Sequence, residues 1–299
     1  MVASPESKYA GALKDKVVIV TGAASGMGKL LVERLVGFGA QVMLVDVNPE
    51  VESMSAAFNA EREKATWWAV CDLQKAGGIQ EYFDQAVEHF GHVDIVVNNA
   101  GIINSASLFS QPDHTDLERV MRINLIAPME GTRVAVRYFK ETGRQGVVLN
   151  TGSISGLTPL SFLETYGTSK AAVLYFTASC KDLAPQVRVN AVAPYYVETP
   201  FIKGSAVIDQ YPMLLKIGVL KPERVVNAML RALCDKSLAG DTLVITDGNK
   251  DERLKIYDDL ALQVSSRLAG GLVSSAISFV GSLVSSMARG AIDLTRRRS

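Results

Sequence analysis

The sequence predicts an α/β protein built on a doubly wound parallel sheet of about seven strands. Short apolar runs alternate with helical patterns along the first 250 residues. Runs such as Val147–Leu149 and Ile95–Val97 are continuously apolar, as expected of parallel strands buried on both faces. A glycine-rich turn joins the first strand to the first helix. The expected strands are 17–21, 41–46, 66–71, 94–98, 146–151, 187–192 and 242–246, and the expected helices lie near 26–38, 51–63, 76–90, 115–140, 164–182 and 222–234.

Composition excludes several classes of protein. The chain has 299 residues, 48% of them hydrophobic, which suffices for one large α/β domain with an appendage. Its formal net charge is zero, so no nucleic-acid partner is expected. The three cysteines form no C-x-x-C pair and the three histidines show no metal-ligand spacing. We therefore expect no metal, and a reducing, cytoplasmic location.

The chain divides into a core and two flanking segments. Residues 1–14 lack the apolar core of a signal peptide and are expected to be a flexible lead-in. Residues 15–250 carry the strand and helix alternation. Within them, 195–220 is apolar and irregular, which favours either a lid over a substrate pocket or a peripheral helical pair. Residues 251–299 are expected to form a helical extension.

The glycine turn between the first strand and first helix predicts a phosphate-binding site. Gly22, Gly26 and Gly28 are spaced G-x-x-x-G-x-G, whereas the commoner dinucleotide fingerprint is G-x-G-x-x-G. Glycines let the backbone approach a pyrophosphate, which the free N–H groups and the helix dipole then hold. The alternative is an ordinary loop rich in glycine.

Asp46 predicts which dinucleotide is bound. It ends the second strand, about 20 residues after the glycines, where a carboxylate can bond both adenosine ribose hydroxyls. It would repel a 2′-phosphate, and neither Ser25 nor Val47 supplies a compensating positive charge. NAD is therefore the expected cofactor. The alternative is a solvated aspartate at a strand end.

Tyr166 and Lys170 are candidates for proton transfer. At i and i+4 on a helix they share one face. A free tyrosine has a pKa of about 10, and a nearby cation, Lys170 or an oxidised nicotinamide, is expected to lower it. Ser153 follows the strand 146–151 at the sheet edge where open α/β sheets bind ligands. Each of these residues could instead be structural. Tyr166 and Lys170 could be a surface pair on one helix face, and Ser153 could be an ordinary turn or helix-capping serine.

Taken together, these motifs resemble the short-chain dehydrogenase/reductase family over residues 15–250. The family pattern is matched in order by Thr21–Gly28, Asp72 after Cys71, Asn98–Gly101, Asn124, Ser153 with Tyr166 and Lys170, and Pro194 with Thr199. The resemblance implies a Rossmann fold with Asn124, Ser153, Tyr166 and Lys170 as catalytic residues. It implies a cofactor site of Gly22, Ser25, Gly26, Met27, Gly28, Asp46, Asp72, Leu73, Asn99, Ala100, Gly101, Tyr166, Lys170, Pro194, Val197 and Thr199.

One departure from the family pattern bears on the pocket. The family usually has Pro-Gly after the sixth strand, and this chain has Pro194–Tyr195. A bulky side chain there would narrow the nicotinamide side of the pocket. Asp46–Asn48, Leu220–Glu223 and Leu238–Ile245 resemble more closely the branch of NAD-linked 15-hydroxyprostaglandin dehydrogenases, which oxidise secondary alcohols on lipophilic molecules.

The resulting hypothesis is an oxidoreductase. It transfers a hydride between NAD(H) and a secondary alcohol or ketone on a lipophilic small molecule, with Tyr166 as general acid and base. Two alternatives are a family member that acts on a reactive biosynthetic intermediate by other chemistry, and a non-catalytic binding subunit. The resemblance also implies a homodimer or homotetramer that pairs the helices near 115–140 and 164–182.

The C-terminal extension has three possible roles. Residues 268–288 carry no charge, their apolar residues fall on one side of a helix, and arginines follow at 289 and 296–298. A membrane-spanning helix is one interpretation, although serines and glycines lower the hydrophobicity of the segment. A helix on a membrane surface, formed by 254–298, would place the arginines against anionic lipids. Packing on the same chain or a neighbouring subunit would cover the apolar face.

Overall fold

A computed structural model of the chain describes residues 5–203, 219–246 and 252–254. Its centre is a sheet of eight strands in the order β3-β2-β1-β4-β5-β6-β7-β8, in which the first seven are parallel and β8 is antiparallel to β7. All seven predicted strands are present, and β8 is an addition. The strands are β1 (Val17–Thr21), β2 (Gln41–Asp46), β3 (Thr66–Val70), β4 (Ile95–Asn98), β5 (Gly146–Thr151), β6 (Val187–Pro194), β7 (Thr242–Ile245) and β8 (Glu252–Leu254).

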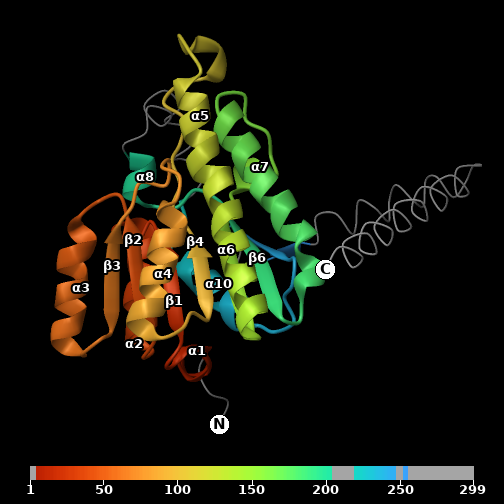
Figure 1. Cartoon of the computed structure of the whole chain (residues 1–299). Coiled ribbons are helices and arrows are strands. Elements are labelled where there is room, and N and C mark those ends of the chain that lie inside the picture. Colours follow the sequence, from red (N-terminus) through yellow and green to blue (C-terminus); the bar gives the residue numbers. More distant parts are fainter. Residues whose placement is uncertain (1–4, 204–218, 247–251, 255–299) are drawn as a thin grey trace, which may run out of the picture. The chain divides into compact units, whose positions relative to one another are not determined.

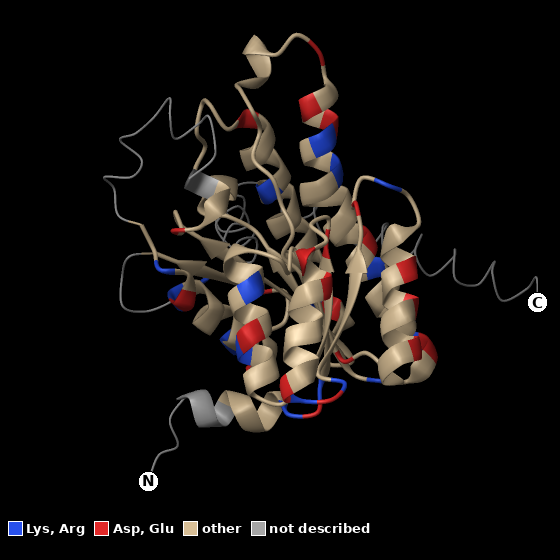
Figure 2. Cartoon of the chain, turned by 90° about the vertical axis from the view of Figure 1, so that its left-hand side faces the viewer, with Lys and Arg blue, Asp and Glu red and all other residues tan. Residues whose placement is uncertain are grey.

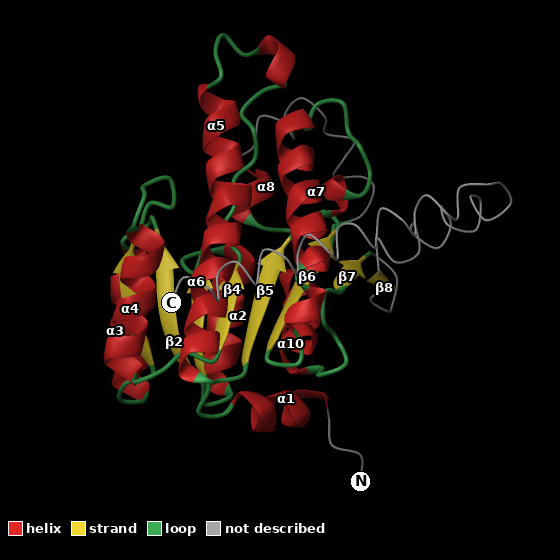
Figure 3. Ribbon diagram, turned by 45° about the vertical axis from the view of Figure 1, so that its right-hand side comes forward, coloured by secondary structure: helices red, strands yellow, loops and turns green. Residues whose placement is uncertain are grey.

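Helices cover both faces of this sheet (Figure 1, Figure 3). Helices α2, α3 and α10 pack on one face, and α4, α6 and α7 pack on the other. The helices are α1 (Pro5–Leu13), α2 (Gly26–Gly37), α3 (Glu50–Glu61), α4 (Gly78–Phe90), α5 (Thr115–Met121), α6 (Ala127–Thr142), α7 (Glu164–Ser179), α8 (Pro200–Lys203) and α10 (Pro222–Cys234), with a π-helix η2 (Arg122–Ile126) and 3-10 turns η1 (Leu108–Ser110), η3 (Ile154–Gly156) and η4 (Lys181–Leu183).

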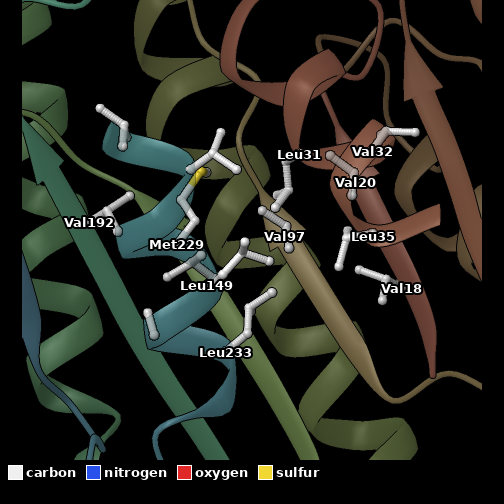
Figure 4. Close-up of a cluster of buried hydrophobic side chains, with 14 of the residues drawn as sticks. Val18, Val20, Leu31, Val32, Leu35, Val97, Leu149, Val192, Met229 and Leu233 are labelled. Atoms are coloured by element: carbon white, nitrogen blue, oxygen red, sulfur yellow. The ribbon is translucent and has the colours of Figure 1, made fainter. Parts of the chain in front are cut away.

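The apolar strand runs supply a core on each side of the sheet. In β1, Val18 and Val20 face α2 and α10, while Val17 and Ile19 face α4 and α6. Figure 4 shows the first of these cores, where strand valines meet leucines of α2 and where Met229 of α10 lies near the middle strands. Because both faces are covered, every residue of such a strand is buried, which explains the absence of polar alternation.

The strand order places a crevice at the carboxyl ends of β1 and β4. From β1 the chain builds outward to β2 and β3, then returns to the other side of β1 and continues through β4 to β7. Helices that follow neighbouring strands therefore leave in opposite directions at this point, and open α/β sheets bind ligands there. The fold is the predicted doubly wound, Rossmann-type sheet.

The N-terminal segment differs from the flexible lead-in expected for residues 1–14. Residues Pro5–Leu13 form helix α1, which contacts α10. Leu13 is 1% exposed and belongs to the core on that side of the sheet. The sequence did not predict this helix because its two core contacts, Tyr9 and Leu13, leave little periodic signal.

The helix expected near 115–140 is interrupted. Between α5 and α6 the π-helix η2 inserts one wide turn, and Asn124 in this turn is completely buried. Single π turns of this kind are frequent at functional sites. The interruption matters below because it orients the amide of Asn124.

Two predicted segments fall largely outside the described residues. The lid expected at 195–220 is described only at 195–203 and 219–220, where Val197 forms a parallel bridge with Leu220. Residues 255–299, the body of the predicted extension, lie outside as well. Within the described ranges, no helix has the length and apolar character needed to cross a membrane. Figure 2 colours the positions of basic and acidic residues on the ribbon, and the two kinds are interspersed in this view.

Strand β8 moves the end of the folded domain from the expected residue 250 to Leu254. Arg253 of β8 donates two hydrogen bonds of 2.8 Å to the carboxylate of Asp241, which is 2% exposed. It donates a third, of 2.9 Å, to the carbonyl of Ser237. The strand therefore neutralises a buried charge and covers the outer edge of β7.

Two shortened chains should show this contribution. A chain ending at Leu254 keeps β8, whereas one ending at Thr246 leaves Asp241 buried without its partner. We expect the second to have a free energy of unfolding lower by about 2 kcal/mol, as for loss of charged hydrogen bonds. Chemical denaturation measures it, with Arg253→Ala in the longer chain as the matched variant. Equal stability of all three chains would contradict the role assigned to β8.

Candidate active site

A cavity of about 950 Å³, its open mouth included, lies at the carboxyl ends of the central strands. The segments that follow β1, β4, β5 and β6 meet in it, together with the start of α7. Thirteen predicted site residues line it: Gly22, Ser25, Gly26, Met27, Asn99, Ala100, Gly101, Ser153, Tyr166, Lys170, Pro194, Val197 and Thr199. Gly28, Asp46, Asp72, Leu73 and Asn124 are not part of this lining.

The glycine turn after β1 is packed too closely for side chains. Gly22 has a φ of +68°, and a Cβ on it would lie 2.9 Å from the Cα of Ala100. A Cβ on Gly28 would collide with the carbonyl oxygen of Gly22. Asn99 fixes the turn, because its amide donates to the carbonyls of Thr21, at 3.0 Å, and Gly22, at 3.2 Å. Gly28 therefore contributes by leaving room for the backbone of Gly22, although it does not line the cavity itself.

Helix α2 begins inside the cavity. Ser25 is its N-cap residue, and no side-chain hydrogen bond caps the helix there. Ser25, Gly26 and Met27 line the cavity at this end. The first N–H groups of the helix have no partner in the helix, and the dipole adds positive potential at the same place. This end of the cavity therefore suits an anionic group such as a pyrophosphate.

Asp46 sits beside the glycine turn at the end of β2. One carboxylate oxygen accepts a hydrogen bond from the backbone of Ala24 at 2.9 Å, and the other accepts from the backbone of Asn48 at 3.0 Å. The amine of Lys29 lies 3.5 Å from Glu50. The 2′-phosphate of NADP would be repelled by the Asp46 carboxylate, because no lysine or arginine at position 25 or 47 offsets the repulsion.

Asp72 and Leu73 follow β3, the neighbouring strand. The backbone N–H of Cys71 donates to the carbonyl of Asp46 at 2.8 Å, which holds the two strand ends together. The carboxylate of Asp72 accepts from the backbone of Gln74 at 3.0 Å. Both residues are therefore at the same sheet edge as Asp46, one strand further out.

The catalytic candidates are gathered on the opposite side of the cavity. Ser153, Tyr166 and Lys170 are 7%, 8% and 3% exposed. The amine of Lys170 donates to the carbonyl of Thr151 at 2.7 Å and lies 5.8 Å from the centre of the Tyr166 ring. The hydroxyl of Ser153 is hydrogen-bonded to Tyr166 and accepts from the backbone N–H of Ser155 at 3.1 Å. A serine, a phenol and an amine thus share one desolvated site.

Burial sets the protonation of this group. Desolvation raises the pKa of Tyr166 to about 12, although the hydrogen bond from Ser153 opposes the rise. Desolvation lowers the pKa of Lys170 to about 8. The expectation that Lys170 lowers the pKa of Tyr166 below that of a free tyrosine is therefore wrong for the protein alone. At neutral pH the phenol is protonated and most Lys170 amines are charged.

Asn124 lies behind the cavity, in the π-helix η2. Its amide oxygen accepts from the backbone of Ile102 at 2.8 Å, and its nitrogen donates to the carbonyl of the same residue at 2.8 Å. Its nitrogen also donates to the hydroxyl of Ser169 at 3.2 Å. A Cβ on Gly101 would lie 3.3 Å from both the Asn124 oxygen and the Lys170 amine, so Gly101 allows these two groups to approach each other.

The segment after β6 closes the fourth side of the cavity. The hydroxyl of Thr199 donates to the carbonyl of Val197 at 3.3 Å. A Cβ on Gly26 would lie 3.3 Å from the Thr199 methyl group, so this segment reaches the glycine turn. Pro194 and Tyr195 also line the cavity, and the tyrosine stands where the family has glycine.

Six cavity residues belong neither to the predicted site nor to the predicted lid. Thr151 ends β5, and the others, which follow β4 or β5 or precede α7, are Ile103, Gly152, Ile154, Ser155 and Leu163. The rule that ligands bind at the carboxyl ends of parallel strands points to the whole segment after β5, so it could have found four of them. Among the described residues, no three histidine, cysteine, aspartate or glutamate side chains gather as a metal site.

Comparison with known proteins identifies the class. Residues 16–206 match the family model described as short chain dehydrogenase. The chain belongs to this family, and it is an oxidoreductase of the dehydrogenase/reductase type.

Individual relatives agree with the family. The mouse 15-hydroxyprostaglandin dehydrogenase [NAD(+)] is 32% identical over 86% of this chain and 98% of its own length. The 3beta-hydroxysteroid dehydrogenase 2 of Eggerthella lenta is 35% identical over 65% of this chain and 75% of its own. A 3-ketoacyl-(acyl-carrier-protein) reductase from Brucella melitensis, solved with NADH, superposes with a TM-score of 0.68 at 29% identity, covering 79% of this chain and 98% of that one.

The lowered pKa of Lys170 predicts a pH dependence of stability. The unfolded lysine binds its proton up to a pH of about 10.4, and the folded one releases it near 8. The contribution of Lys170 to stability should therefore increase as pH rises through this window, by on the order of 3 kcal/mol for the protein without cofactor, against the opposite contribution of Cys71 and Cys180. Denaturation at several pH values measures it, and Lys170→Met should lack this increase. The same pH dependence in both proteins would contradict the burial argument.

Proposed function

We propose that this protein transfers a hydride between NAD(H) and a secondary alcohol or ketone on a lipophilic small molecule. The observation that carries the proposal is the joint burial of Ser153, Tyr166 and Lys170 in a cavity whose other end is the glycine turn. The names of relatives, which include prostaglandin, hydroxysteroid and borneol dehydrogenases, support the same type of reaction.

In this proposal a dinucleotide extends from Asp46, outside the cavity lining, across the glycine turn to Thr199 in the cavity wall. In the proposal the carboxylate of Asp46 binds the adenosine ribose, and Asp72 with Leu73 flank the adenine. The N–H groups at the start of α2 hold the pyrophosphate. Lys170 and Tyr166 bond the second ribose, and the segment Pro194–Thr199 holds the carboxamide. The bound cofactor accepts or gives the hydride at its nicotinamide ring.

Tyr166 transfers the proton in this proposal, as general acid or general base. When a ketone is reduced, the carbonyl oxygen gains the Tyr166 proton while its carbon gains the hydride. In the reverse direction, the alcohol oxygen loses its proton to the Tyr166 oxygen. Ser153 holds the substrate oxygen, and with the oxidised cofactor bound, the positive charges of its nicotinamide ring and of Lys170 together favour the phenolate. Asn124 supports the proton path from behind Lys170 through its contacts with Ile102 and Ser169.

The cavity wall suits a lipophilic substrate. Ile154 follows the catalytic serine, and Tyr196 and Phe201 come from the segment after β6. The Phe201 ring lies 6.1 Å from that of Tyr166, so apolar surface reaches the proposed acid. Wall residues of this type bind a hydrocarbon skeleton by burying it.

Tyr166→Phe tests the proposed chemistry. Only a hydroxyl is removed, so folding and NADH binding should be nearly unchanged. Turnover should fall about 100- to 10,000-fold, the usual contribution of a general acid–base group. Steady-state assays with NAD⁺ and lipophilic secondary alcohols measure it, and Tyr138→Phe on the distant α6 is the control. Full activity of Tyr166→Phe would remove the phenol from the mechanism.

Asp46 should determine cofactor preference. Its charge opposes a 2′-phosphate, so NADH should bind more tightly than NADPH in direct titration. In Asp46→Ser combined with Val47→Arg the repulsion is replaced by attraction, and the preference should move toward NADPH by about tenfold or more, equivalent to about 1.4 kcal/mol. Tighter binding of NADPH to the unaltered protein would contradict this assignment.

We also propose a homodimer or homotetramer that pairs helices α6 and α7, in a cytoplasmic protein whose three cysteines are free thiols. Ile126, Met129 and Tyr175 expose 39%, 40% and 59% of their surface next to or on these helices. Met129→Glu should place a charge in the interface and shift the protein toward monomer in sedimentation experiments, with Glu141→Gln as a control. A monomeric unaltered protein at micromolar concentration would contradict the proposal.

A further inference from the structure

Tyr196 is a phenol-bearing residue in the largely apolar wall of the cavity. Its ring packs against Leu163 and Tyr166 in a small cluster that also includes Ile103. The residue lines the cavity with Ser153 and the cofactor segments. Aromatic and aliphatic side chains surround the ring, and the Tyr196 hydroxyl is one of the few polar groups in this part of the wall, beside those of Tyr166 and Tyr195.

The ring is held in place from two sides. Tyr195 packs edge-on against it, with ring centres 4.9 Å apart and an interplanar angle of 83°. The backbone is fixed as well, since the carbonyl of Tyr196 accepts a hydrogen bond of 2.7 Å from the N–H of Leu220, and the N–H of Glu198 donates to the carbonyl of Leu220 at 2.9 Å. The orientation of the phenol is therefore set before a substrate enters, which reduces the entropy cost of using it.

The hydroxyl has bonding capacity to spare. Within the part of the chain that the structure describes, it makes no hydrogen bond to protein. Burial and the neighbouring Tyr195 raise the pKa of Tyr196, so it is a neutral phenol and a hydrogen-bond donor at neutral pH. Covering a half-buried donor in an apolar wall costs free energy when the ligand does not accept its hydrogen bond.

We propose that Tyr196 is a specificity-determining residue that donates a hydrogen bond to a second oxygen atom of the substrate, separate from the oxygen that reacts at Tyr166. The preferred substrates are then lipophilic secondary alcohols or ketones that carry an ether, carbonyl or hydroxyl oxygen close to the reacting carbon. Purely hydrocarbon alcohols would leave the phenol covered and unpaired. The inference rests on the proposed function, because it concerns the substrate of the same site.

Matched pairs of substrates test this role. Cyclohexanols with a methoxy group at position 2, 3 or 4 differ from the corresponding ethyl compounds by an oxygen in place of a methylene. For at least one position, the unaltered enzyme with NAD⁺ should prefer the methoxy compound in kcat/KM by about fivefold, the effect of one neutral hydrogen bond. Tyr196→Phe should abolish this preference, because the ethyl compound then no longer covers an unpaired donor and its kcat/KM rises toward that of the methoxy compound.

The outcomes separate the two claims. Loss of the preference in Tyr196→Phe, but not in the control Tyr138→Phe, supports the inference. It is overturned if the unaltered enzyme shows no preference at any position, or if Tyr196→Phe keeps it. Absence of NAD⁺-dependent oxidation of all six compounds would count against the proposed function instead. In that case, cofactor fluorescence measures how tightly each methoxy and ethyl compound binds to the protein with NADH. Tighter binding of a methoxy compound that is lost in Tyr196→Phe supports the inference, and equal binding of each pair overturns it.

Discussion

The close approach of the chain at the ends of β1 and β4 is the constraint on which the rest of the site depends. Gly22 and Gly28 leave no room for side chains, and the amide of Asn99 ties the two strand ends together. Parallel pairing of β1 with β4 brings these segments to the same edge. Because the turn is this tight, α2 starts directly at the cavity and directs its unpaired N–H groups into it.

The same constraint positions the catalytic side chains. Gly101 continues the segment that Asn99 fixes, and its missing side chain lets Asn124 and Lys170 approach from behind. Lys170 is then held by the carbonyl of Thr151, at the end of β5. Two neighbouring strand ends, β4 and β5, therefore define where the phenol and the amine lie relative to the glycine turn. Burial in this arrangement, rather than the pairing of Tyr166 with Lys170, controls the pKa values of both groups.

The features that the sequence predicted are those encoded by local pattern. Continuous apolar runs identify buried parallel strands, and the spacing of glycines identifies the turn, since few other residues adopt that backbone. The features it did not predict depend on tertiary contacts. Strand β8 is three residues long and is stabilised by the pairing of Arg253 with Asp241, 12 positions away. The raised pKa of Tyr166 likewise results from burial by Leu163 and its neighbours, which no spacing within the helix reveals.

Transfer of deuterium tests the central claim, hydride exchange between substrate and dinucleotide at this edge of the sheet. The unaltered protein would be incubated with NAD⁺ and a lipophilic secondary alcohol that carries deuterium on its carbinol carbon. Mass spectrometry and proton NMR of the recovered NADH report where the label goes. Direct hydride transfer in a fixed geometry predicts one deuterium per NADH, on one face of the nicotinamide ring. Ketone formation without deuterium in the cofactor, or label on both faces, would contradict it.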